Sequence, residues 1–487
     1  MRQLLFADQL GPHFDLGGEI TLVESLGRLK AHNYHWAKAQ LILSAIRHRA
    51  AESNRVTLIQ SDGYREFLAS LPEQNFVAIN PTSYGFRKLV ESDQIKTLPS
   101  RGFVTDEIEF QNWVVGKAGK RLLLEDFYRW SRQKHSILMD DAEPAGGQWN
   151  FDHENREPAP KKQAKLGVAD PWWPVEDEID AQVRADLRSW QQAGLINLTG
   201  TEGPRLFAAT REEALAALDH FIDHRLPSFG PWEDAALADD WAMSHSLLSV
   251  PLNLGLLDPL EVVQAAEAAF RAGKAPINSV EGFIRQIMGW RDYVWHLYWH
   301  FGESYVDNNA LNANVDVPKS WLDLDPESIT SNCIRHTIGG LGERGWLHHI
   351  ERLMILGNVA MQRSFNPAQL NQWFIDNFVD GTPWVMPANV IGMSQFADGG
   401  MMSTKPYAGG GSYISKMTNY CGGCQFDPKQ RVGEQACPVT AGYWNFLSTH
   451  EARFRQNRRM LQPLAGLKKL ADLEQILVQE ANRGTEL

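Results

Sequence analysis

All four cysteines of the chain lie in its last third, at Cys333, Cys421, Cys424 and Cys437. Only two glycines separate Cys421 from Cys424, so both sulfurs can point at the same metal. Tetrahedral sulfur ligands suit either zinc or an iron–sulfur cluster. Because cysteine is often buried as an inert thiol, four core thiols are the alternative. The spacing favours one metal site with four sulfur ligands.

A second group of candidate residues is the pair His348 and His349, followed by Arg352. His349 and Arg352 are three residues apart and would share one face of a helix. An imidazole can donate a proton near neutral pH, although an isolated histidine is more often only hydrogen-bonded. The stretch therefore offers a candidate proton donor.

Three further stretches suit ligand contacts, each with an ordinary structural alternative. Residues 244–249, Ser-His-Ser-Leu-Leu-Ser, place hydroxyls at a helix start, which suits a phosphate or a simple N-cap. The loop 380–413 is rich in glycine and aromatic residues, so its backbone can approach a flat ligand, or it is a plain long loop. Residues 281–293 read as an amphipathic helix with a charged face.

Length and composition limit the class of protein. The chain has 487 residues, more than the roughly 250–300 at which a single core stops growing, so we expect at least two domains. The start carries Asp8 and no long apolar run, so we expect neither a signal peptide nor a membrane span. Metal-binding thiolates indicate a reducing, cytoplasmic location. The net charge of −12 argues against a general polyanion binder, but it leaves local basic surfaces open.

The elements that must position these residues differ along the chain. Apolar runs at 4–6, 56–59 and 76–79 alternate with helical patterns at 25–51 and 64–71, which predicts a parallel, Rossmann-like sheet with crossover helices in an α/β domain, residues 1–130. Such sheets bind ligands at the carboxyl ends of their strands. Asp8, Gln9 and Leu10 therefore form a candidate pocket edge.

A connector and a helical domain follow. Residues 131–175 are rich in proline, glycine and lysine, as is typical of a long connector. Helical patterns at 176–193, 212–224, 259–272 and 281–300 then predict that residues 176–487 are almost all α. Composition and spacing alone do not identify the reaction that this protein catalyses.

Long motifs now carry a family resemblance. Residues 281–293 and 244–249 resemble the flavin-binding core of the photolyase and cryptochrome superfamily. Residues 389–400 and 404–407, with the four cysteines, resemble its iron–sulfur bacterial branch, whose repair-active members are prokaryotic (6-4) photolyases, also called deoxyribodipyrimidine photolyase-related proteins. The resemblance covers nearly the whole chain, including residues 8–10, 44–48 and 149–156, and it implies the photolyase architecture.

The resemblance also implies three cofactors. Flavin adenine dinucleotide (FAD) would be bound by phosphate contacts at Ser244, Ser246, Leu247 and Ser249, by Trp290 and Arg291 at the pocket mouth, and by Arg352, Asp380 and Asn389 around its ring. The four cysteines would hold a [4Fe-4S] cluster. An antenna chromophore, 6,7-dimethyl-8-ribityllumazine, would lie between Asp8–Leu10 and a wall formed by residues 24–38.

The implied activity is light-driven repair of (6-4) photoproducts in UV-damaged DNA by a monomer. Reduced FAD would donate an electron to the lesion, and His349, assisted by His348 and Arg352, would supply a proton. Trp373, with Trp321 or Trp384, would relay electrons to the flavin, but Phe374 stands where relatives can have a tyrosine, and phenylalanine is a poor hole carrier. Candidate DNA contacts are the clusters Arg453, Arg455, Arg458 and Arg459 or Lys161, Lys162 and Lys165, each of which could equally be a solvated charged face. A divalent cation that bridges acidic residues to phosphate would relieve the repulsion.

The same sequence features are compatible with two other functions. The first is a cryptochrome-type blue-light receptor that keeps the same cofactors without repairing DNA. The second is a zinc-stabilised binding protein that has no flavin.

Overall fold

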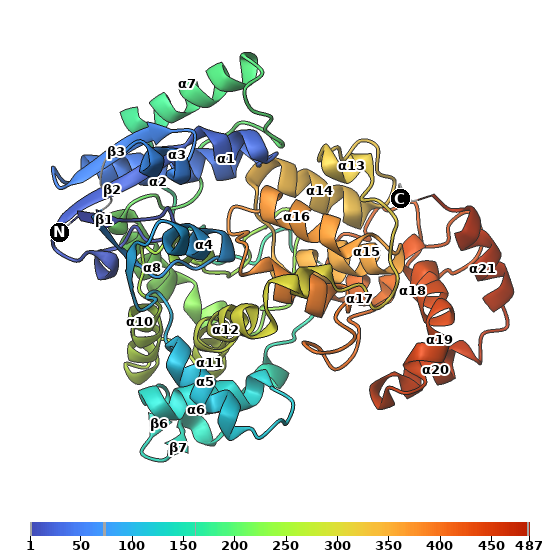
Figure 1. Cartoon of the computed structure of the whole chain (residues 1–487). Coiled ribbons are helices and arrows are strands. Elements are labelled where there is room, and N and C mark those ends of the chain that lie inside the picture. The colour runs from blue at the N-terminus through green and yellow to red at the C-terminus, as the bar shows by residue number, and fades with distance from the viewer. Residues whose placement is uncertain (1, 72–74, 161, 485–486) are drawn as a thin grey trace.

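The computed structural model describes residues 2–71, 75–160, 162–484 and 487. The N-terminal part is built on a five-stranded parallel sheet in the order β3-β2-β1-β4-β5. Its strands are β1 (Arg2–Leu4), β2 (Glu19–Ser25), β3 (Val56–Ser61), β4 (Phe76–Ile79) and β5 (Lys96–Leu98). The sheet occupies one side of the molecule, drawn in blue in Figure 1. Together with the helical remainder it confirms the predicted fold class.

The helices of this part are α1 (Leu26–Ala31), α2 (Trp36–Ala51), α3 (Tyr64–Ala69), α4 (Tyr84–Ser92), α5 (Glu107–Gly116) and α6 (Leu124–His135). The single helix predicted over 25–51 is wrong, because the chain breaks between α1 and α2. His35 caps α2 by accepting a hydrogen bond from the Ala37 amide at 3.0 Å. The His35 amide itself donates to the Asp376 carbonyl, far along the chain, at 3.0 Å. A tertiary contact therefore overrides the local helical pattern.

The predicted connector has little regular structure. It contains the hairpin of β6 (Met139–Asp140) and β7 (Glu143–Pro144) and the 3-10 turns η2 (Ala145–Gly147) and η3 (Asp152–Glu154). Helix α6 crosses residue 130, and α7 (Glu178–Gln192) packs against α2 beside the sheet, as Figure 1 shows. The boundaries at 130 and 175 stay predictions.

The remaining helices form the larger part of the molecule, from green to red in Figure 1. In chain order they are α8 (Arg211–His224), η4 (Leu226–Ser228), α9 (Ser249–Asn253), α10 (Pro259–Arg271), α11 (Ile277–Ile284), η5 (Arg285–Arg291), α12 (Asp292–Phe301), η6 (Glu303–Asp307), α13 (Lys319–Leu322), α14 (Asn332–Arg344), η7 (Glu351–Gly357), α15 (Asn358–Gln362), α16 (Pro367–Asn377), η8 (Ala388–Ser394), α17 (Gly411–Met417), α18 (Pro438–Thr449), α19 (Glu451–Phe454), η9 (Arg458–Met460), α20 (Leu461–Leu467) and α21 (Leu473–Asn482). None of these helices, within the described ranges, is long and apolar enough to cross a membrane.

The largest hydrophobic core joins the sheet to the first helices of the helical part. It contains Leu5 and Ile20 from the sheet region, Leu218 from α8 and Phe283 from α11. A second core lies around α14, α15 and α16 and includes Cys333. The two parts of the chain thus share buried apolar surface, which fixes the sheet edge relative to the helices.

Candidate functional site

Three π-helical segments lie in the stretches that carry the sequence motifs. They are η5, η7 and η8, at residues 285–291, 351–357 and 388–394. π-Helical turns are rare and occur frequently at functional sites. At the contact between η7 and η8, a Cβ on Gly357 would lie 2.2 Å from the Ser394 hydroxyl, so a larger residue would force Ser394 to move. The backbone is therefore specialised where the motifs meet.

A partly buried ion pair links residues from three of the sequence motifs. The Arg352 guanidinium donates to both carboxylate oxygens of Asp380, at 2.8 and 3.1 Å. The Ser249 hydroxyl donates to the same carboxylate at 2.8 Å. The cation lies 4.4 Å from the centre of the Phe378 ring. Ser249, Arg352 and Asp380, which are distant in sequence, thus form one charged centre.

Arg291 is connected to this centre through Asn253. It donates to the Gly102 carbonyl at 2.8 Å and to the Asn253 side-chain oxygen at 3.4 Å, and Asn253 donates to the Asp380 carbonyl at 3.0 Å. Burial lowers the pKa of Arg291 to about 10. Trp290 is half-buried, and the Asn389 amide donates to the Val385 carbonyl at 2.8 Å. Asn253 was missed as a functional residue because an isolated asparagine carries no spacing signal.

The 244–249 segment is held by hydrogen bonds between its serine hydroxyls and nearby backbone groups. The Ser244 hydroxyl donates to the Ser228 carbonyl at 3.0 Å, and the Ser246 hydroxyl accepts from the Leu248 amide at 3.3 Å. Leu247 has a left-handed φ of 58°. Ser246 and Leu247 line a small cavity with Arg225, whose pKa burial lowers to about 10. Arg225 donates to the carbonyls of Met243 and His245 and so shapes the loop, a role that sequence reasoning did not find.

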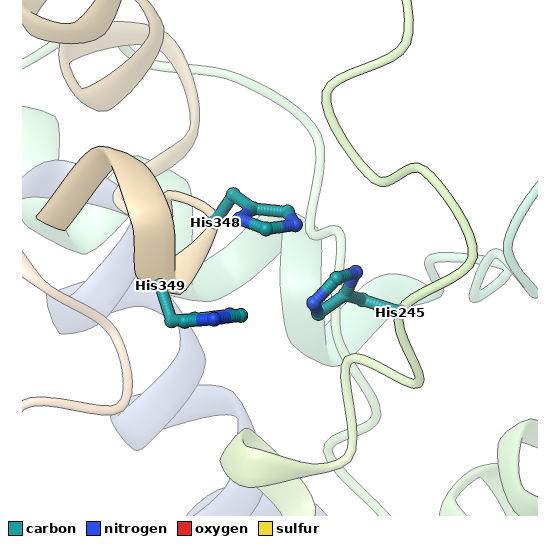
Figure 2. Close-up of side chains that lie close together, drawn as sticks. All are labelled: His245, His348 and His349. Atoms are coloured by element: carbon teal, nitrogen blue, oxygen red, sulfur yellow. The ribbon is translucent and has the colours of Figure 1, made fainter. Parts of the chain in front are cut away.

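Three histidine rings meet next to this loop. Figure 2 shows His245 facing His348 and His349 from the opposite segment. The ring centres are 4.0 Å apart for His245 and His348 and 4.8 Å apart for His348 and His349. The His349 Nε2 atom lies 3.0 Å from Asp234 Oδ1, and the two side chains are 46% and 28% exposed. His349 is therefore the member of the cluster that is open to the surface.

The protonation of the cluster follows from burial. Burial, with the charges of neighbouring groups, holds the pKa of His245 and of His348 well below the ordinary value, so both rings are neutral. The Ile350 amide donates to His348 Nδ1 at 3.1 Å, which leaves the proton of neutral His348 on Nε2. Burial raises the pKa of Asp234, but the hydrogen bond and charge of His349 outweigh it and the net pKa is lowered. An ionised carboxylate thus faces His349.

Several ring nitrogens of the cluster lack partners. Both nitrogens of His245 and the Nε2 atom of His348 are buried without a hydrogen-bond partner among the described residues. Buried polar atoms are normally satisfied, so these atoms mark a place for a polar ligand or water. Asp234 was missed from the sequence because a lone aspartate 115 positions away carries no motif.

The four cysteines converge on one cavity. Cys333 lies in the first turn of α14, Cys437 directly precedes α18, and Cys421 and Cys424 occupy the turn between α17 and α18. Burial, and then repulsion from the other three sulfurs, raises the pKa of Cys333 well above its ordinary value. Four thiolates that line one cavity need a bound cation. The donor set therefore fits a metal or a metal cluster.

The cysteine segment also supports the histidine cluster. The Tyr420 hydroxyl, next to Cys421, donates to Glu351 Oε1 at 2.7 Å. The other oxygen of Glu351 accepts from the His348 amide at 3.1 Å. Both side chains are buried. The turn that carries Cys421 and Cys424 and the histidine pair are thus joined by two consecutive hydrogen bonds.

The carboxyl end of β1 offers another polar pocket. The Thr82 hydroxyl donates to Asp8 Oδ2, whereas Asp8 Oδ1 and the side-chain oxygen of Gln9 are buried without partners among the residues described. Burial raises the pKa of Asp8. The Leu10 amide donates to the Leu254 carbonyl at 3.1 Å, close behind α9. These unpaired acceptors suit a ligand that donates hydrogen bonds.

The tryptophans predicted to relay electrons are buried. The rings of Trp373 and Trp321 lie 5.5 Å apart and are 4% and 2% exposed. Trp384 is 2% exposed, and its ring centre lies 5.2 Å from that of Phe103. The structure brings Trp373 and Trp321 together and leaves Trp384 in a different apolar cluster.

Comparisons with solved structures define the class of the fold. A class III photolyase from Agrobacterium tumefaciens superposes with a TM-score of 0.58 at 15% identity, covering 93% of this chain and 98% of that chain. The Synechocystis sp. PCC6803 cryptochrome superposes with a TM-score of 0.53 at 12% identity, covering 82% and 83%. The fold is therefore that of photolyases and cryptochromes.

Sequence comparisons give the family. Residues 3–195 match the family described as deoxyribodipyrimidine photo-lyase-related protein. The (6-4) photolyase of Agrobacterium fabrum is 36% identical over 506 residues, which cover 96% of each chain. The chain belongs to this family of photolyase-related proteins, which confirms the resemblance found in the sequence.

Proposed function

We propose that this protein is a light-driven (6-4) DNA photolyase that repairs (6-4) pyrimidine–pyrimidone photoproducts by electron transfer from reduced FAD. The observation that carries the proposal is the His349–Asp234 pair, open to the surface and adjacent to the neutral rings of His245 and His348. The near full-length similarity to a protein named as a (6-4) photolyase supports it. FAD, when bound, supplies the one-electron chemistry that side chains cannot.

The residues of the helical part fit FAD. Ser244, Ser246, Leu247 and Ser249 would hold its phosphates, Trp290 and Arg291 would line the pocket mouth, and Arg352, Asp380 and Asn389 would surround its ring. The support is the ion pair of Arg352 with Asp380, which Ser249 joins through a hydrogen bond. The unpartnered nitrogens of His245, next to the phosphate segment, are further polar groups that a buried ligand would satisfy.

His349 would hold the proton that the lesion needs. Its Nε2 atom lies 3.0 Å from Asp234 Oδ1, and this contact would hold the ring in a fixed orientation. His348 keeps its proton on Nε2 and stays neutral, so it would act as a fixed hydrogen-bond donor. General acids of this kind contribute roughly 10²- to 10⁴-fold to a rate. Arg352, one helical turn on, would set the local charge.

DNA would approach over a rim of mixed charge. The rim surrounds Tyr407, and burial raises the pKa of its hydroxyl. Four neighbouring charges also influence this pKa, and they come from Arg156, Arg459, Asp152 and Asp234. Arg453, Arg455, Arg458 and Arg459 are exposed, as are Lys162 and Lys165, while Lys161 lies outside the described residues. These cations would contact phosphates, and a damaged, poorly stacked base pair costs less to flip out of the duplex.

The carboxylates of the rim would repel phosphates, so we expect a divalent cation to strengthen binding. The measurement is the affinity for a (6-4) oligonucleotide with and without magnesium, at constant ionic strength. An affinity that ignores magnesium would end this part of the proposal.

The four cysteines would hold a [4Fe-4S] cluster. A single zinc ion with Zn–S bonds of about 2.3 Å would need sulfurs about 3.8 Å apart. Among the described residues, the groups that bring three potential ligand atoms within 4.8 Å of one another contain no cysteine. Sulfurs that repel one another but stand further apart support the larger cluster.

An antenna chromophore, 6,7-dimethyl-8-ribityllumazine, would bind at the carboxyl end of β1. The unpartnered oxygens of Asp8 and Gln9 would accept hydrogen bonds from it, and residues 24–38 would form the opposite wall. The amide of Leu10 already links this pocket to the helix that begins at Ser249. An antenna held there would supply excitation energy, and the residues of α9 and the Leu10 amide would hold the two sites at a fixed separation.

The test is illumination of a (6-4) oligonucleotide with reduced protein in the presence of magnesium. We expect repair by the wild type, loss of repair in His349→Ala, and retention in His300→Ala, which alters an exposed histidine on α12. Absorption spectra would first establish flavin in each sample. Flavin-loaded wild type that repairs nothing would contradict the proposal and favour a photoreceptor.

A further inference from the structure

One lysine of the sheet-bearing part of the chain is buried against the helical part. Lys38, in the first turn of α2, is 5% exposed, and its ammonium donates to the carbonyls of Ile375 and Gly381. The bond to Gly381 is 2.5 Å long, and the ammonium lies 5.1 Å from the centre of the Tyr34 ring. Figure 1 shows α1, the helix before α2, next to α16. Lys38 therefore carries a donor group from one part of the chain to the other.

The contact satisfies the open end of α16. Val379 could continue this helix by donating to the Ile375 carbonyl, but its amide donates to the Gly345 carbonyl at 2.8 Å. The last carbonyls of a helix carry a partial negative charge, which a cation stabilises. Lys38 supplies this cation at the point where the chain leaves α16.

The turn that follows α16 carries Asp380. A Cβ on Gly381 would lie 2.6 Å from the Phe374 carbonyl oxygen, so the backbone after Asp380 is pressed against the end of the helix. The Asp380 carbonyl accepts from Asn253 at 3.0 Å, and the next carbonyl, that of Gly381, accepts from Lys38. Two donors from separate elements thus hold successive carbonyls of this turn.

Burial of an ammonium group is costly, and the pKa of Lys38 reflects the cost. Burial lowers this pKa to about 7; the charges of Asp376 and Asp380 oppose the shift, and that of Arg28 adds to it. An apolar side chain of the same length would fill the space without this cost. A lysine at this position therefore indicates that its donor atoms are needed.

We propose that Lys38 is a positioning residue for the flavin site, because it holds the turn after Asp380 and thereby the orientation of the Arg352–Asp380 ion pair. The inference rests on the proposed binding of FAD beside this pair. Loss of the donor would free the carbonyls of Ile375 and Gly381 and let the turn move. FAD would then be held less tightly, although every residue proposed to surround its ring is unchanged.

The test compares wild type with Lys38→Met, which keeps the length of the side chain but removes its donors. We expect the FAD-loaded variant to release FAD roughly 10-fold faster on dilution, as follows from the loss of a hydrogen bond to a charged group. Hydrogen–deuterium exchange should quicken in peptides that contain residues 378–381. The flavin bands of the circular dichroism spectrum should change as well, because they report the surroundings of the ring.

Two further variants separate the donor role from packing. Lys38→Gln keeps a donor without the charge, so it should release FAD more slowly than Lys38→Met but faster than wild type. Lys88→Met is the matched control: it removes an exposed lysine that also bridges the two parts of the chain, through Glu303 at 2.6 Å, and it should behave as wild type. Thermal unfolding of each variant verifies that it is folded.

The outcomes distinguish this inference from the proposed function. Wild-type protein that holds no FAD contradicts both. Folded Lys38→Met that releases FAD at the wild-type rate overturns the inference alone, and so do equal release rates from the two Lys38 variants. If Lys38→Met does not fold, wild-type release from Lys38→Gln has the same force. Faster release from Lys38→Met supports the inference even where wild type repairs no lesion.

Discussion

Replacement of Asp234 by asparagine isolates the electrostatic contribution of one carboxylate to repair. Asp234→Asn keeps the shape of the side chain and a polar contact to His349, but removes the negative charge 3.0 Å from its ring nitrogen. Because the pKa of Asp234 lies below its ordinary value, the wild-type carboxylate is charged at every pH used for repair. The variant therefore loses the negative charge that faces the imidazole ring of His349.

The size of the effect follows from the distance and the exposure. At 3.0 Å two unit charges attract by roughly 5 kcal/mol at an effective dielectric constant of about 20, and by about 1.4 kcal/mol in water. The side chains are 46% and 28% exposed, so solvent screens the pair toward the lower limit. We take about 1–2 kcal/mol, which corresponds to a loss of roughly 5- to 30-fold in repair rate.

The assay is the single-turnover repair rate of a bound (6-4) oligonucleotide under constant light, compared with His349→Ala and with the control Asp323→Asn. Asp323 is a surface carboxylate paired with Lys319, so its replacement should leave repair unchanged. We expect Asp234→Asn to fall between wild type and His349→Ala. Repair by Asp234→Asn at the wild-type rate, with equal binding of DNA, would refute the role given to the ion pair.

Three further changes test how the site is held together. Burial raises the pKa of Glu233 from 4.5 to about 7, so folding takes up a proton between these pH values. The free energy of unfolding should therefore fall by on the order of 3 kcal/mol as pH rises through this range. Urea unfolding at pH 5 and pH 8 should show this fall in wild type but not in Glu233→Gln. Tyr420→Phe leaves the buried Oε1 atom of Glu351 without a donor and should cost about 1–3 kcal/mol of unfolding free energy, whereas Tyr443→Phe on α18 should cost less; equal losses would contradict the link. Cys421→Ala should give insoluble or flavin-depleted protein, and a soluble, flavin-loaded variant would speak against a structural role for the cluster.

Local patterns predicted much of the fold. Short apolar runs alternating with amphipathic stretches are sufficient to predict a parallel sheet, since parallel strands need crossover helices. The helix predicted over 25–51 failed because His35 contacts the carbonyl of Asp376, a partner that no local window contains. The strand β2 was likewise missed, because its identity depends on pairing with β1 and β3.

Some residues of the candidate site could likewise be predicted from local spacing, whereas others join it only through tertiary packing. The spacing of Cys421 and Cys424 indicates a metal site, because ligands of one metal must point the same way. Cys333 joins them only through the packing of α14 against the turn that carries Tyr420.

By itself, therefore, the sequence determined which residue types could do chemistry: the four thiols and the histidine pair. Only the tertiary structure decided which charges and rings face them. Asp234 lies beside His349, Asn253 beside Arg291, and Trp321 beside Trp373, and each pair is widely separated along the chain. The physical reason is that Coulomb attraction and electron transfer depend on distance in space, and folding sets that distance through contacts that no sequence motif records.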